Sequence, residues 1–129
     1  MNKSTILKTF NSHLMEFIND VIILMPEDLD LKTAATFMEG IKKVNPRLII
    51  STWNNWVVTE YRTEIEIGDF SFFEDKDYSR DMVGSASENK ILEVIERIRK
   101  DVKSMGTTNK NKTLKYMQNL TKLSDIYFS

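Results

Sequence analysis

Residues 3–26 read KSTILKTFNSHLMEFINDVIILMP, and this stretch sets the fold class. Apolar side chains recur in it with the spacing of one face of an α-helix. They are Ile6, Leu7, Phe10, Leu14, Phe17, Ile18, Val21, Ile22 and Met25. Pro26 ends the pattern, because proline lacks a backbone donor and clashes with the preceding turn. The stretch therefore predicts an amphipathic helix over residues 3–25.

The next two predicted helices follow the same period. Asp30 is a suitable N-cap for a helix over residues 31–44. Asn45-Pro46 then places a cap before a proline at the first helical position, and Gly68 is placed to end that helix, so the third helix is predicted over residues 46–67. The second helix carries Ala34, Phe37, Met38, Ile41 and Val44, and the third carries Leu48, Ile49, Trp53, Trp56, Val57, Tyr61 and Ile65.

The C-terminal part predicts two more helices. Ser85-x-x-Glu88 matches a capping box before a helix over residues 88–105. Residues 107–113 (TTNKNKT) are predicted to be a polar connection, and a last helix is predicted over residues 110–127. The fold class is therefore all-α, a single domain (residues 1–129) built as a compact bundle of about five helices, with an aromatic and acidic loop after the third.

Composition bounds the class of protein. The chain has 129 residues, of which 41% are hydrophobic and 29% charged, and this balance is typical of a globular domain. It has no cysteine, which excludes disulfides and thiolate chemistry. The N-terminal residues lack the features of a signal peptide, and the longest apolar run, residues 21–25, is too short to span a bilayer. We expect no membrane insertion.

The loop after the third helix, residues 68–81, reads GDFSFFEDKDYSRD and raises the question of a metal site. A calcium loop that starts at Asp75 would need glycine where Arg80 stands and glutamate where Ala86 stands, so that pattern fails. A weaker metal site at Glu74, Asp75 and Asp77 stays open. A pair of catalytic carboxylates for glycoside hydrolysis also stays open, although a small helical bundle offers a poor sugar cleft.

The aromatic residues of the same loop favour a structural role. Large rings are disfavoured in water, so we expect them to fold back over the bundle while the carboxylates stay solvated. The alternative is that some of the rings, together with two tryptophans that share a helix face, bind a partner protein. The protein-binding candidates are Trp53, Trp56, Phe70, Phe72, Phe73 and Tyr78.

Charge is distributed unevenly along the chain. Residues 1–84 carry 9 basic and 14 acidic residues, whereas residues 85–129 carry 9 basic and 5 acidic ones. The two halves could attract each other within the fold, or the basic half could contact phosphates. A solvated face is the simpler interpretation, since no base-reading motif is present. The candidates for nucleic-acid contact are Arg97, Lys100, Lys103, Lys110, Lys112 and Lys115.

Catalytic signatures are missing from the sequence. His13 is the one histidine, and it flanks the apolar face of the first predicted helix. The nucleophile elbow G-x-S-x-G, the phosphate loop and the dinucleotide fingerprint G-x-G-x-x-G do not occur. We therefore expect a protein that is not an enzyme and that uses no cofactor.

Several segments, taken in order and spacing, resemble a family of small proteins of the nucleocytoplasmic large DNA viruses that infect algae and protists. The resemblance covers nearly the whole chain. It is carried by residues 17–20 (FIND), 25–28 (MPED), 44–47 (VNPR), 68–73 (GDFSFF), 76–78 (KDY) and 115–123 (KYMQNLTKL). None of these segments is a biochemical signature, and the family supplies no catalytic residues to carry over.

The resemblance implies a context. It points to a viral product of the host-cell cytoplasm that is packaged in the virion, with other capsid components as its partners. The expected function is that of a non-enzymatic scaffolding protein, a minor capsid component that binds major capsid units. Homo-oligomerisation is left open. The alternative is a nucleic-acid-associated accessory factor that acts through the basic C-terminal half.

Overall fold

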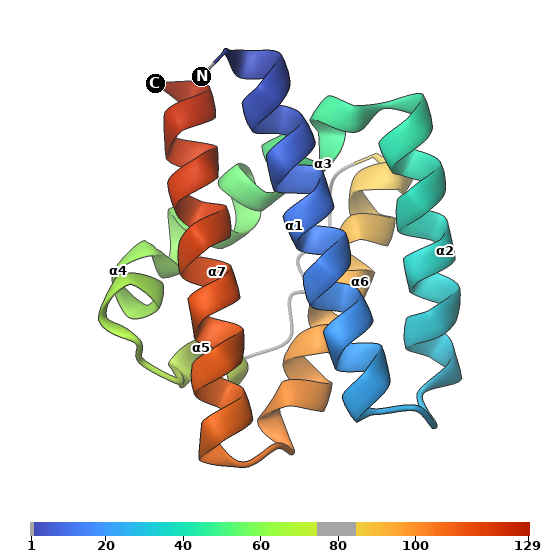
Figure 1. Cartoon of the computed structure of the whole chain (residues 1–129), viewed down its shortest axis with the longest axis vertical. Coiled ribbons are helices and arrows are strands. Elements are labelled where there is room, and N and C mark those ends of the chain that lie inside the picture. Colours follow the sequence, from blue (N-terminus) through green and yellow to red (C-terminus); the bar gives the residue numbers. More distant parts are fainter. Residues whose placement is uncertain (1, 75–84) are drawn as a thin grey trace.

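The computed structural model describes residues 2–74 and 85–129, and the regular secondary structure of these residues consists of helices joined by short turns. This confirms the all-α prediction. The first helix, α1 (Lys3–Leu24), lies alongside the last, α7 (Thr107–Phe128), and the two chain ends lie close together (Figure 1). Asn2 caps α1 by accepting a hydrogen bond from the Thr5 amide at 2.8 Å.

The second helix, α2 (Leu29–Val44), lies at one edge of the bundle against α1, α3 and α6 (Figure 1). It begins earlier than predicted, because Asp28 rather than Asp30 is its N-cap. The Asp28 carboxylate accepts a hydrogen bond from the Leu31 amide at 3.1 Å. The sequence offers two aspartates two residues apart, and the tertiary contacts of Asp28, described below, select between them.

The predicted third helix, residues 46–67, is three consecutive pieces: α3 (Pro46–Thr52), the π-helical segment η1 (Trp53–Val58) and α4 (Thr59–Ile67). The prediction of one regular helix is therefore wrong. The wider π-turn inserts an extra residue into the helical repeat. It lets Trp53, Val57 and Val58 all be buried. Tyr61, with φ −124°, then breaks α4, and Gly68 ends it in the left-handed conformation at φ 77°, as expected.

A short helix, α5 (Ser71–Glu74), packs against α6 (Ala86–Lys103) and α4. The capping box of Ser85 and Glu88 is present, which confirms that prediction. The helix after it begins two residues earlier than predicted and ends two residues earlier. The predicted polar connection at 107–113 is wrong, because these residues form the first turns of α7, where Thr113 is already buried.

The core lies between α1, α2, the α3–η1–α4 segment, α6 and α7, and α5 adds aromatic rings to it. Its largest fully buried side chains are Trp53, Phe10, Phe72, Leu14, Ile18, Leu31, Met38, Ile49, Ile50, Ile65, Ile91 and Leu92. α7 contributes Leu114, Met117 and Leu120. An apolar face of this kind on each helix is what the spacing of the sequence predicts.

Candidate functional site

The outward face of α2 exposes several large apolar side chains along one helix. Phe37 and Val44 are 49% and 87% exposed, and Leu29 at the start of the helix is 68% exposed. The sequence pattern grouped Phe37 and Val44 with the core residues of this helix, but they lie on its solvent side. Clustered exposed apolar residues of this kind are typical of interaction sites.

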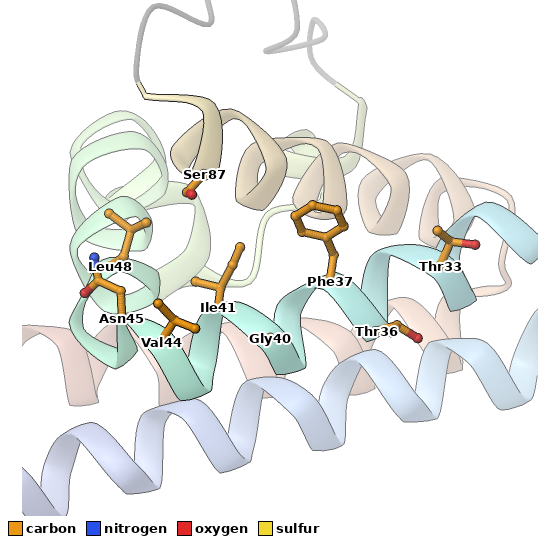
Figure 2. Close-up of a pocket in the computed structure, with 9 residues that line it drawn as sticks. All are labelled: Thr33, Thr36, Phe37, Gly40, Ile41, Val44, Asn45, Leu48 and Ser87. Atoms are coloured by element: carbon orange, nitrogen blue, oxygen red, sulfur yellow. The ribbon is translucent and has the colours of Figure 1, made fainter.

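Phe37 and Val44 line an open groove of about 800 Å³ on α2 (Figure 2). Figure 2 shows Ser87, at the start of α6, on the side opposite the lining residues of α2. The lining residues are Thr33, Thr36, Phe37, Gly40, Ile41, Val44, Asn45, Leu48 and Ser87. A mostly apolar groove with a few hydroxyl and amide groups along it suits an amphipathic helix better than a charged small molecule.

Phe37 separates this groove from a smaller hollow of about 290 Å³ between α2 and α6. Thr33 and Phe37 line both spaces, and the Lys90 ammonium nitrogen lies 5.4 Å from the centroid of the Phe37 ring. The smaller hollow is also lined by charged groups from the two helices, Asp30, Lys90, Glu93 and Arg97. The apolar groove therefore has a charged rim at this end.

Gly40 lies in the middle of α2, within the groove. A Cβ atom added to it would meet no heavy atom within 4 Å, and its backbone does not adopt the positive φ that favours glycine. Glycine in a helix interior costs about 0.5–1 kcal/mol relative to alanine. No contact among the described residues requires glycine at this position. A binding partner that approaches the α2 backbone closely would require a residue without a side chain here.

Charge along the exposed side of α2 changes sign from one end to the other. Exposed Asp30 lies in its first turn and exposed Glu27 just before it, whereas exposed Lys43 lies in its last turn and exposed Arg47 follows in the first turn of α3. This arrangement complements the helix dipole at both ends. α2 is therefore flanked by carboxylates at its N-terminal end, where Asp30 also lies 3.7 Å from Arg97, and by cations at its C-terminal end.

The predicted protein-binding aromatics fall into two groups. Trp53, Phe72 and Phe73 are buried in the core, each about 2% exposed, so they do not face solvent. Trp56 and Phe70 are partly buried and pack against that core. Tyr78 lies outside the described residues. The prediction that the rings of Phe72 and Phe73 fold back over the bundle is confirmed.

Arg99, which is buried on α6, holds Phe72 of α5 in place. Its Nε donates to the Phe72 carbonyl oxygen at 2.6 Å, and an Nη donates to Glu96 at 2.5 Å. The guanidinium carbon lies 4.8 Å from the Phe72 ring centroid, and that ring packs edge-on against Tyr61. A buried cation needs such partners, because an unpaired one would be strongly destabilising.

The predicted metal cluster at Glu74, Asp75 and Asp77 depends on Asp75 and Asp77, which lie outside the described residues. Within residues 2–74 and 85–129, no group of three or more His, Asp or Glu side chains is arranged to hold a metal ion. The weak metal site stays a prediction.

The predicted nucleic-acid residues are spread over α6 and α7, and several have partners within the fold. The Arg97 Nε donates to Asp28 at 2.7 Å. The Lys112 ammonium lies 4.0 Å from Asp20, and the Lys110 ammonium lies 5.5 Å from the centroid of the Phe70 ring. Lys100, Lys103 and Lys115 are exposed. Nucleic-acid contact stays a prediction, and the partners of Arg97 and Lys112 favour attraction within the fold.

The strongest candidate for acid–base chemistry is a polar cluster between α1 and α7. The Tyr116 hydroxyl donates to Asp20 and contacts Glu16 at 3.5 Å, and the His13 ring lies 4.9 Å from the Tyr116 ring. Burial and the hydrogen bond to Asp20 raise the Tyr116 pKa well above its ordinary range, so the hydroxyl stays a donor near neutral pH. The cluster therefore joins two helices, and it offers no phenolate nucleophile.

A second pair of carboxyl groups lies under α2. Burial, a hydrogen bond with Asp28 and the negative charge of Asp28 raise the pKa of Asp101 to about 7. Burial disfavours ionised Asp28 as well, but hydrogen bonds from Arg97 and from Asp101 hold its pKa well below the ordinary range. When Asp101 is un-ionised it can donate to the Asp28 carboxylate, which in turn caps α2.

No protein-family model, no curated protein and no solved structure matches this chain. In the described ranges, each helix is either too short or too polar to cross a membrane. Sequence patterning did not identify the α2 groove. The available signal was Gly40 in the middle of a predicted helix that also carries Phe37 and Val44.

Proposed function

We propose that this protein is a non-enzymatic scaffolding component of a large DNA virus particle, a minor capsid protein that uses the α2 groove as a protein-docking surface. The observation that carries the proposal is the groove itself, in which Phe37 and Val44 are exposed beside Gly40. Exposed apolar side chains around a groove are typical of protein interaction sites. The particle context rests on the resemblance of the sequence to a viral family.

The other features of the chain are consistent with a binding role. The most reactive-looking cluster, Tyr116 with Asp20 and Glu16, joins α1 to α7 through a hydroxyl that keeps its proton. The buried aromatics and Arg99 stabilise the α5–α6 contact. The apolar side chains on the outer face of α2, by contrast, are exposed around a groove that can admit a partner.

The test is copy number in purified particles, measured by quantitative mass spectrometry after a high-salt wash. A repeated structural role predicts on the order of hundreds of salt-resistant copies per particle, because a bridging component must recur with the capsid units it joins. Near-absence from washed particles would overturn the proposal. It would also move attention to the nucleic-acid alternative, for which linear loss of log affinity with log salt is the signature.

A pair of matched variants separates the groove from general surface effects. Val44→Glu places a charge in the groove, whereas Ile67→Glu places the same charge on α4 at a residue that is 71% exposed. We expect Val44→Glu to reduce incorporation into particles and Ile67→Glu to leave it unchanged. Equal incorporation of both variants would remove the groove from the proposal.

A further inference from the structure

We infer that the α2 groove binds a second copy of this chain, with the two α2 helices packed antiparallel across a twofold axis. This inference rests on the proposed function, since it names the occupant of the same docking surface. The resulting dimer would keep its other faces free, so it could present two identical sets of contacts to capsid units.

Charge complementarity favours a second copy as the occupant. In an antiparallel pair, the N-terminal end of one α2, with Asp30 and the preceding Glu27, lies beside the C-terminal end of the other, with Lys43 and the following Arg47 of α3. Asp30 also lies 3.7 Å from Arg97 of its own chain, and it is 82% exposed toward a partner. A twofold interface repeats this contact, so both ends of the groove are matched at once. A parallel pair would instead place like charges together at both ends.

The shape of the helix agrees with this arrangement. If the helices cross between Thr36 and Gly40, Thr36 of each copy lies opposite Gly40 of the other, and the open space at Gly40 admits the partner's side chain. At about 1.5 Å of rise per residue, Asp30 then lies roughly 12 Å from the crossing point, and Lys43 of the second copy lies roughly 8 Å from it on the same side, within reach of a long side chain.

The apolar residues become buried in this pair. Val44 of one copy would enter the other copy's groove on the N-terminal side of Gly40, where Thr33, Thr36 and Phe37 line it. This would remove from water the two most exposed apolar side chains of the groove, Phe37 and Val44. It would also provide the close backbone approach that explains a glycine in the middle of α2.

The test uses two charge-reversal variants of the full chain in sedimentation equilibrium. One variant, Lys43→Glu with Arg47→Glu, makes both ends of the groove acidic. The other, Glu27→Lys with Asp30→Lys, makes both ends basic. All four residues are exposed, and the buried cap Asp28 is left intact. Circular dichroism and urea unfolding of each variant establish that the monomer is folded.

The wild type is expected to form dimers across the micromolar range. Each variant alone should dimerise at least about tenfold more weakly, because like charges then face each other at both ends. An equimolar mixture of the two variants should recover dimers, because each acidic end then meets a basic one. Val44→Glu should give monomers, whereas Ile67→Glu should remain dimeric.

Three outcomes would overturn the inference: a monomeric wild type, variants that each associate as strongly as the wild type, or a mixture no stronger than its components. The second outcome would indicate a parallel pair or another surface. A monomeric wild type whose incorporation into particles is still lost in Val44→Glu would leave the proposed function standing, with a different capsid protein in the groove. A charge-dependent dimer that is absent from washed particles would support this inference and overturn the proposed function.

Discussion

α5 and the outer face of α2 each carry a phenylalanine, but the ring on α5 is buried in the core and the ring on α2 is half exposed. Phe72 is 2% exposed and lies under Arg99, whereas Phe37 is 49% exposed beside a glycine. The difference comes from what lies opposite each ring. α5 packs on α6 and α4, whereas the groove side of α2 is open to solvent. Aromatic content alone therefore does not separate a core from a docking surface.

The largest test of this comparison is the pair Phe72→Ala and Phe37→Ala. Loss of the fully buried ring should lower the free energy of unfolding by about 3–5 kcal/mol, because a cavity remains in the core. Loss of the exposed ring should change it by less than about 0.5 kcal/mol. Urea denaturation of both variants measures the difference. Similar losses in the two would mean that Phe37 also packs in the core.

Replacement of Arg99, the buried cation that contacts Phe72, should have the next largest effect on stability. Arg99→Met removes the donor to the Phe72 carbonyl and leaves Glu96 without this ion pair, so we expect a loss of about 3 kcal/mol. The matched control is Arg62→Met. Arg62 forms a two-pronged pair with Asp125 at 2.7 Å, but its side chain is 45% exposed. That control should cost less than about 1 kcal/mol, and equal losses in calorimetric unfolding would contradict the buried role of Arg99.

The buried carboxyl group of Asp101, on α6 beside Asp28, should make the free energy of unfolding depend on pH. The ordinary pKa of Asp101 is 3.8 and its folded value is about 7, so the folded state favours the neutral form. This contribution is fully present below pH 3.8 and is lost as pH rises through about 7. We expect the free energy of unfolding to fall by about 2 kcal/mol between pH 5 and pH 8.

Asp101→Asn keeps a donor toward Asp28 at every pH, so it should remove most of this decline and be more stable than the wild type at pH 8. Asp28, whose pKa is lowered, contributes stability above its ordinary range that is lost as pH falls. Parallel urea curves from pH 5 to pH 8 provide the measurement. Identical pH slopes in the two proteins would contradict the assignment.

Gly40→Ala should have the smallest effect on the stability of the monomer. We expect it to stabilise the monomer and to weaken dimerisation. Space around Gly40 is open, so alanine should stabilise the isolated chain by about 0.5–1 kcal/mol through helix propensity. The same change should weaken the dimer, because the added methyl group fills the space that Thr36 of the second copy would enter. Unfolding at low protein concentration and sedimentation at high concentration separate the two effects. A stabilised monomer with unchanged association would place the contact elsewhere on the chain.

Local sequence determined most of the helices. Pro26 and Pro46 fix where chain segments end and begin, Gly68 supplies the left-handed residue after α4, and Ser85 with Glu88 forms the cap of α6. These signals act over a few residues, so they can be recognised without knowledge of the fold. The burial of Phe72 followed from the cost of exposing a large ring to water.

Tertiary structure decided the rest. The π-turn at residues 53–58 follows from the need to bury Trp53, Val57 and Val58 together, and the choice of Asp28 over Asp30 as a cap follows from its contacts with Arg97 and Asp101. The exposure of Phe37 and Val44 depends on which neighbours α2 has. Helical spacing identifies which residues share a face, but only the packing of the other helices determines whether that face is covered.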